Sequence, residues 1–154
     1  MEICPTIEEF NVIMGKPDVS TLFIPTTSED FADLAQDLLG ISLAVAQQWC
    51  TLNHLNIRMV FAYFSQLAIP VASRVRSHYL NAFCLCILAR YFLVHETYRV
   101  DQRVCLVANN LNKGSPLGMI LVETFNGLDV VHREETTFFV GSLLFLQVWF
   151  LTFA

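Results

Sequence analysis

The stretch Phe138–Ala154 reads FFVGSLLFLQVWFLTFA and holds no charged residue and only one amide, Gln147. Water-soluble domains usually bury such apolar side chains and keep polar residues on the surface. We therefore expect one of two arrangements for this segment. It is either a membrane anchor, or a helix whose packing partners lie in further residues of a larger domain.

The composition indicates one compact domain with an apolar surface. The chain has 154 residues, of which 55% are hydrophobic and only 15% are charged. Typical domains have roughly 25% charged residues, so we expect some apolar surface to remain exposed, either as an interface or where a missing piece of the protein would cover it. The net charge is −5, and most of the excess acid lies in residues 1–40. Residues 41–154 are only faintly basic, which is unlike the dense Lys/Arg stripe of a dedicated nucleic-acid domain.

Cysteine usage points to a reducing compartment. The start of the chain, MEICPTIEEF, has neither the basic nor the apolar region of a secretory signal. We predict reduced and mostly buried thiols in an intracellular protein. The five cysteines are an odd number and lie at positions 4, 50, 84, 86 and 105.

Helix signals dominate the chain. Thr6 and Glu9 form a capping box, which predicts a helix from there to about Met14. The spacing of Phe31, Leu34, Ala35 and Leu38 predicts one buried stripe on a second helix, which Gly40 would end. Further helices are predicted at about 42–49, 57–68, 73–94, 101–111, 115–128 and 134–153.

These patterns predict an all-α fold, an irregular bundle of about seven or eight helices, in one domain covering residues 1–154. Within the helix at 57–68 we expect one buried stripe, which comprises Ile57, Val60, Phe61, Phe64, Leu67 and Ala68. The second half of the helix at 73–94 is apolar nearly all round, so we expect other helices or lipid to enclose it. Strand signals are few.

The search for reactive centres predicts no catalytic, cofactor-binding or metal-binding residue, and we expect a protein that is not an enzyme. Cys84 and Cys86 would point to nearly opposite sides of a helix, so they cannot share one metal ion. The segment His132–Glu135 is better explained as a solvated helix start. Loop Asn112–Gly118 lacks the residue order of a phosphate-binding loop. The only lysines, Lys16 and Lys113, lack the apolar setting that would lower a lysine pKa.

Two small basic groups are the candidates for contact with nucleic acid. The first comprises Arg74, Arg76 and His78. In the second, Arg99 and Arg103 would share one face at helical spacing and could touch a phosphate. Ordinary helix-surface charge, including an Asp101–Arg103 pair, explains both groups better, since nucleic-acid binding usually needs several clustered cations.

The membrane alternative rests on residues 138–154. This segment has 17 residues, at the short edge of what spans a bilayer, for which about 20 are usual. Its aromatic residues are scattered, whereas a spanning helix places Trp and Tyr at its two ends. We therefore favour a buried helix of a helical domain and keep a C-terminal membrane anchor as the alternative.

Four segments in a fixed order resemble a known family. They are Pro5–Phe10, Leu80–Phe83, Gly114–Leu128 and Phe138–Trp149, and the most specific part is the helix Ile120–Leu128 followed by Gln147-Val148-Trp149. Together they resemble a plant family of transposon-linked helical proteins of unknown function, akin to the plant mobile domain, which is also labelled aminotransferase-like. The resemblance spans nearly the whole chain.

The resemblance implies a transposon-derived plant module located in the nucleus. Together with the lack of a recognisable reactive centre in the sequence, it leads us to expect a non-enzymatic protein that acts through contacts with a protein partner. Family members extend further on both sides, so the resemblance implies a fragment of a larger family domain. It supplies no catalytic residue that could be carried over. The aminotransferase-like label would suggest a pyridoxal enzyme, for which Lys16 and Lys113 give no support.

Overall fold

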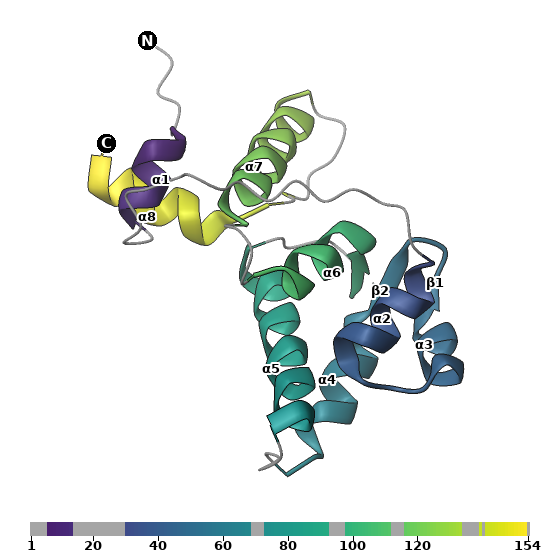
Figure 1. Ribbon diagram of the computed structural model, residues 1–154. Helices are drawn as coiled ribbons and strands as arrows, with labels where there is room; N and C mark the ends of the chain where they lie inside the picture. The colour runs from purple at the N-terminus through teal and green to yellow at the C-terminus, as the bar shows by residue number, and fades with distance from the viewer. Residues whose placement is uncertain are drawn as a thin grey trace.

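The computed structural model describes residues 6–13, 30–68, 73–92, 98–111, 116–133, 139 and 141–153. Within these ranges the fold is mostly α-helical, as the sequence predicts, and one small antiparallel sheet is added (Figure 1). The helices are α1 (Ile7–Ile13), α2 (Phe31–Leu39), α3 (Leu43–Trp49), α4 (Ile57–Ser65), α5 (Ser73–Ile87), the π-helical segment η1 (Leu88–Phe92), α6 (Gln102–Asn109), α7 (Leu117–His132) and α8 (Leu143–Phe153). The strands are β1 (Cys50–Thr51), β2 (His54–Asn56) and β3 (Arg99–Asp101).

The helix ends form where local chemistry predicts them. The Thr6 backbone N–H donates to Glu9 Oε2 at 2.9 Å, and the Glu9 N–H donates to Thr6 Oγ1 at 3.3 Å, which completes the capping box. Gly40 ends α2 with a left-handed φ of 64°, as the predicted terminator should. Its Cα lies so close to the His78 ring that an added Cβ would come within 2.6 Å of His78 Cδ2. Glycine is therefore required here for both conformation and space.

The core is built mainly on α2, α5 and α6. The predicted α2 stripe of Phe31, Leu34, Ala35 and Leu38 is buried throughout. α2 contacts both α5 and α6, and α5 contacts α6, so the three helices enclose one apolar centre. In Figure 1, α5 stands upright in the lower part of the molecule, with α2, α3 and the sheet to its right.

The sheet, which the sequence patterns did not predict, positions the starts of two helices. The strands run antiparallel in the order β1-β2-β3, and Leu55 pairs with Val100 at its centre, where both side chains are buried. The last residue of β2, Asn56, accepts the Arg58 N–H and caps α4, while the last residue of β3, Asp101, accepts the Arg103 N–H and caps α6. Each of these strands therefore leads directly into a capped helix.

The burial predicted for α4 and α5 is partly wrong. On α4, Val60 and Phe64 are buried, but Phe61 is 64% exposed, and Leu67 just beyond the helix is also exposed. On α5, Ala82 and Leu85 of the apolar run are buried, but Phe83 in the same run is exposed. The described helices cover only one side of each element, so the apolar run of α5 is not enclosed on every side.

The expected single helix from Glu134 to Phe153 is also wrong. Gly141 has a φ of +129°, Ser142 is not helical, and α8 begins only at Leu143. The predicted start of that helix, residues 134–138, lies outside the described part of the chain. None of the helices that the structure describes has the length and apolarity needed to cross a membrane.

Gly141 and Ser142 join α8 to α7 and η1. A Cβ on Gly141 would lie 2.7 Å from the Thr124 Cα in α7. The buried Ser142 N–H donates to Thr124 Oγ1 at 3.0 Å, and the Thr124 hydroxyl donates to the Ile120 carbonyl at 2.6 Å. Ser142 Oγ accepts the Phe145 N–H, capping α8, and donates to the Tyr91 carbonyl of η1 at 3.3 Å. This joint fixes both where α8 begins and what it packs against.

α1 holds the other end of α8. The Trp149 indole Nε1–H donates to Glu9 Oε2 at 2.8 Å, across 140 residues of sequence. Trp149 and Phe145 are buried on the inner side of α8, and α1 contacts both α7 and α8. α1, α7 and α8 thus form an upper group of helices above α5 and α6 (Figure 1).

The replacement Gly141→Ala should destabilise the fold by roughly 2 kcal/mol or more, because the new Cβ meets backbone and the φ is one that side chains rarely adopt. Chemical unfolding followed by circular dichroism measures the change. Asn126→Ala, at an exposed position on α7, is the control and should change stability by less than about 0.5 kcal/mol. Equal stability of the two variants would contradict the close approach of Gly141 to α7.

The Glu9 contact should make stability depend on pH. The pKa of Glu9 is lowered from 4.5, first by the hydrogen bond from the Thr6 backbone N–H and then by the bond from Trp149. A lowered folded-state pKa means that the stabilisation is complete above the unfolded pKa and is lost as pH falls through the folded value. The melting temperature of the wild type should exceed that of Glu9→Gln at pH 7, and the two should converge as the pH falls below 4.5. Glu8→Gln is the control. If the wild type keeps its full advantage in melting temperature over Glu9→Gln at pH 3, the result would contradict the Glu9–Trp149 contact.

Candidate interaction surface

One open hollow lies beside the start of α2 and has a volume of about 400 Å³. Asp30, at its edge, uses Oδ1 to accept the Ala32 N–H at 2.9 Å and so serves as the α2 cap. Burial, with a further contribution from the charge of Asp30, raises the pKa of the Cys50 thiol to about 11, so it is not a nucleophile near neutral pH. The lining comprises Asp30, Phe31, Ala32, Gln47, Cys50, Leu52, Asn53 and Gln102.

Burial also protects two further thiols, Cys86 and Cys105. Burial raises the pKa of Cys86 to about 11, and full burial in α6 raises that of Cys105 further. Cys50, Cys84 and Cys86 are half-buried and Cys105 is fully buried, and all four are free thiols. Cys4 lies outside the described residues. In the part of the chain that the structure describes, no three His, Cys, Asp or Glu side chains gather as metal ligands would.

The structure separates the two basic groups that the sequence suggested for nucleic acid. Arg99 lies on β3 and Arg103 on α6, so the expected shared helical face does not exist. Arg103 instead pairs with Asp101 at 2.9 Å and with Glu123 at 3.4 Å. In the first group, His78 Nδ1 lies 3.3 Å from the Leu38 carbonyl oxygen near the end of α2, and Arg76 is exposed. The Arg74 side chain lies outside what the structure describes, as do Lys16, Lys113, Asn112–Ser115 and Glu134–Glu135.

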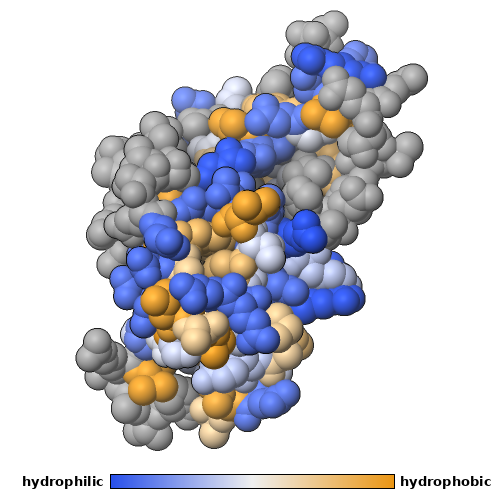
Figure 2. Space-filling model, turned by 90° about the vertical axis from the view of Figure 1, so that its right-hand side faces the viewer, coloured by the Kyte–Doolittle hydropathy of each residue, from blue (hydrophilic) through white to orange (hydrophobic). Residues whose placement is uncertain are grey.

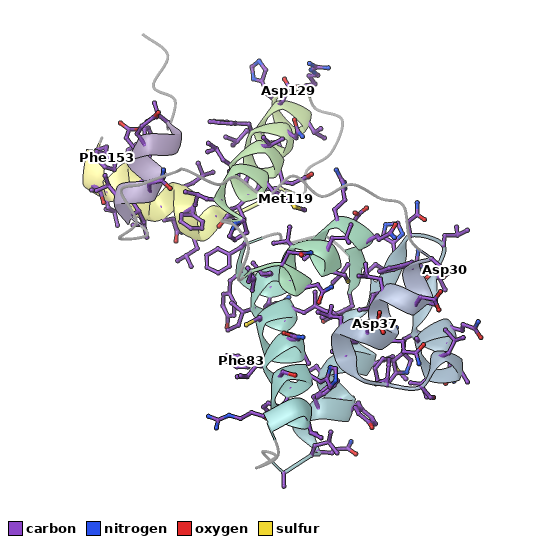
Figure 3. All side chains as sticks on the ribbon, viewed as in Figure 1. Asp30, Asp37, Phe83, Met119, Asp129 and Phe153 are labelled. Carbon is purple, nitrogen blue, oxygen red and sulfur yellow. The ribbon has the colours of Figure 1, made fainter. Side chains whose placement is uncertain are left out.

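The most distinctive exposed feature is an apolar stripe along α5 and η1. Leu80, Phe83, Ile87 and Tyr91 follow one another at intervals of three, four and four residues, which places them on one face. We call these four residues the α5 stripe. Phe83 and Tyr91 are each 57% exposed, Leu80 is exposed to a similar degree, and Ile87 is half-buried. In Figure 3, Phe83 points to the left of α5, away from α2.

Two arginines frame the α5 stripe. Arg76 lies one turn before Leu80, and Arg90 lies one turn after Ile87 and beside Tyr91. Both are exposed, and neither forms an ion pair with a described residue. At a rise of 1.5 Å per residue the two are about 20 Å apart along the helix. The surface therefore combines an uncovered apolar strip with a cation at each end.

On the face shown in Figure 2, hydrophobic residues form small groups separated by hydrophilic ones. In the sequence, the apolar run after Asn81 contains three of the four stripe residues, Phe83, Ile87 and Tyr91. The pattern predicts that this run is enclosed, because a sequence pattern does not show which side of a helix its neighbours cover.

No protein-family model, curated protein or solved structure matches this chain.

The thiols should respond to alkylation as buried groups. At pH 8, iodoacetamide should modify Cys50 and Cys86 slowly, because with a pKa of about 11 only about one thiol in a thousand is ionised. Their rates should continue to rise about tenfold per pH unit between pH 9 and 10, where an ordinary thiol approaches its limit. Peptide mass spectrometry measures each site separately. Cys105 should stay unmodified until the protein unfolds, and rapid labelling of the folded protein would contradict its position in the core.

Proposed function

We propose that this chain is a non-enzymatic helical module that acts through protein contacts, and that the α5 stripe receives an amphipathic helix of its partner. The observation that supports this most strongly is the uncovered row Leu80, Phe83, Ile87 and Tyr91 on a helix whose other side is packed. Rows of apolar anchors at spacings of three and four residues are how helices dock on helices.

The charges define the chemistry of the partner. Arg76 and Arg90 lie at the two ends of the α5 stripe, so a matching helix carries carboxylates about four turns apart, on either side of its apolar residues. Such charges at the rim of an interface contribute orientation and specificity more than affinity. The partner is therefore an acidic amphipathic helix, and its apolar residues supply most of the binding energy.

The resemblance to transposon-linked plant proteins adds a cellular setting to the proposal. It supports a plant protein of transposon origin, part of a larger family domain, that works in the nucleus. The two separated basic groups do not favour direct binding to nucleic acid, since Arg103 is held by Asp101 and Glu123. A protein partner is accordingly preferred over a nucleic acid.

Attachment to a membrane through residues 138–154 is the competing proposal. A fluorescent fusion and extraction with alkaline carbonate separate the two. A nuclear signal with release into the carbonate supernatant supports the protein-contact module. Membrane staining with retention in the pellet would contradict it and support the anchor.

A synthetic helical peptide tests the α5 stripe directly. The probe has 18 residues, with leucines spaced three and four apart and glutamates in its first and last turns, and the matched control peptide carries lysines in place of the glutamates. Fluorescence anisotropy should show the glutamate peptide binding about tenfold more tightly, because two ion pairs at partly exposed sites contribute about 1–2 kcal/mol together.

Variants of the protein test whether the peptide binds at the α5 stripe. Phe83→Ser should abolish binding of the glutamate peptide, while Phe61→Ser, at an equally exposed position on α4, should leave it unchanged. Replacing both Arg76 and Arg90 by Glu should reverse the preference toward the lysine peptide. Equal binding of both peptides, or binding unaffected by Phe83→Ser, would overturn the proposed docking surface.

A further inference from the structure

The outer side of α8 is a second uncovered surface, distinct from the α5 stripe. Phe145 and Trp149 pack inward, whereas Leu143, Leu144, Phe150 and Leu151 expose between 44% and 85% of their surface. Together with the exposed Gln147 they lie on one side of the helix, since they are spaced by one, three, three and one residues. We call these five residues the α8 outer face. α8 lies at the edge of the upper group of helices, with Phe153 at its free end (Figures 1 and 3).

The α8 outer face has a symmetric order. Leu143 and Leu151 are each four residues from Gln147, and Leu144 and Phe150 are each three residues from it. If a second α8 runs antiparallel with Gln147 opposite Gln147, every apolar residue meets an apolar residue, because Leu143 and Leu144 of one copy lie at the level of Phe150 and Leu151 of the other. A two-fold interface requires this reciprocity, in which residue i contacts residue j of the partner and j contacts i.

We propose that the α8 outer face binds the same face of a second copy of this chain, forming an antiparallel helix pair centred on Gln147.

Charge favours a second copy over other partners. Residues 141–153 contain no charged side chain, although the chain as a whole carries a net charge of −5. An acidic or basic partner would find no counter-charge on α8, and the self-pairing meets no like charge at its centre. The Gln147 amide offers both a donor and an acceptor, so two facing amides satisfy each other. A neutral, self-complementary face therefore fits a copy of itself.

The exposed area fits a reversible dimer. If a large apolar side chain offers roughly 200 Å², the four exposed apolar residues present on the order of 500 Å² per copy, or about 1,000 Å² for the pair. Specific interfaces begin at about this size, and the smallest of them belong to weak or transient complexes. We therefore expect a dimer that dissociates on dilution, with a Kd on the order of micromolar.

Charge reversal at the two-fold axis gives a specific test. Light scattering coupled to size-exclusion chromatography, run from about 1 µM to about 200 µM protein, should show the wild type passing from monomer to dimer. Gln147→Glu alone and Gln147→Lys alone should stay monomeric, because each places two like charges face to face. An equimolar mixture of the two should recover the dimer, since the facing charges are then opposite.

Two further variants distinguish a specific loss of dimer formation from general effects on folding. Leu151→Glu should give a folded monomer by circular dichroism, because Leu151 is the most exposed apolar residue of the face. Phe61→Ser on α4 should dimerise like the wild type. The inference is overturned if the wild type remains monomeric throughout, or if the mixed charge variants fail to associate. It is also overturned if the wild type binds neutral phosphatidylcholine vesicles as a monomer, which would assign the face to lipid.

The peptide assay on the α5 stripe and the dimer assay on α8 use different residues. Phe83→Ser should remove peptide binding without changing the dimer, and Leu151→Glu should do the reverse. If either variant lost both peptide binding and dimer formation, the result would contradict the separation of the two surfaces.

Discussion

The backbone at Gly141 passes so close to α7 that no side chain fits between them, since a Cβ there would lie 2.7 Å from the Thr124 Cα. This close approach lets the buried Ser142 N–H reach Thr124 Oγ1, and the Ser142 hydroxyl then serves both the first turn of α8 and the carbonyl of Tyr91. Unpaired, these buried polar groups would each cost about 1–3 kcal/mol. The joint between α7, η1 and α8 is therefore specified by one glycine, one serine and one threonine.

This joint also determines which apolar side chains remain on the surface. By starting α8 at Leu143, it turns Phe145 and Trp149 inward, where Trp149 reaches Glu9, and leaves Leu143, Leu144, Phe150 and Leu151 outside. On the α5 side, the packing of Leu85 and Leu88 against the core leaves Phe83 and Tyr91 uncovered. Part of the apolar excess of the composition therefore appears as two separate helix faces. Each of the two proposals places a second helix against one of these faces.

The features that local chemistry controls could be predicted from the sequence, and those that depend on distant neighbours could not. The sequence predicts the Thr6–Glu9 capping box and the Gly40 terminator because each of these contacts joins residues three or four positions apart. β2 and β3 pair residues about 45 positions apart. Each strand is only three residues long, so no periodic pattern in the sequence predicts it. The break at Gly141 depends on the approach of α7, and the exposure of Phe61 and Phe83 depends on which sides the other helices cover. For this reason the sequence does not predict the α5 stripe as an exposed surface.

Amide hydrogen exchange at Ser142, followed by NMR on ¹⁵N-labelled protein, is the most direct measurement of the joint. The account predicts that this N–H, which lies outside any helix yet is buried and bonded to Thr124 Oγ1, exchanges as slowly as the interior amides of α7. Replacing Thr124 by Val, which removes the acceptor while keeping the shape, should abolish that protection. Rapid exchange of the Ser142 amide in the wild type, at the rate of a solvent-exposed loop, would contradict the account.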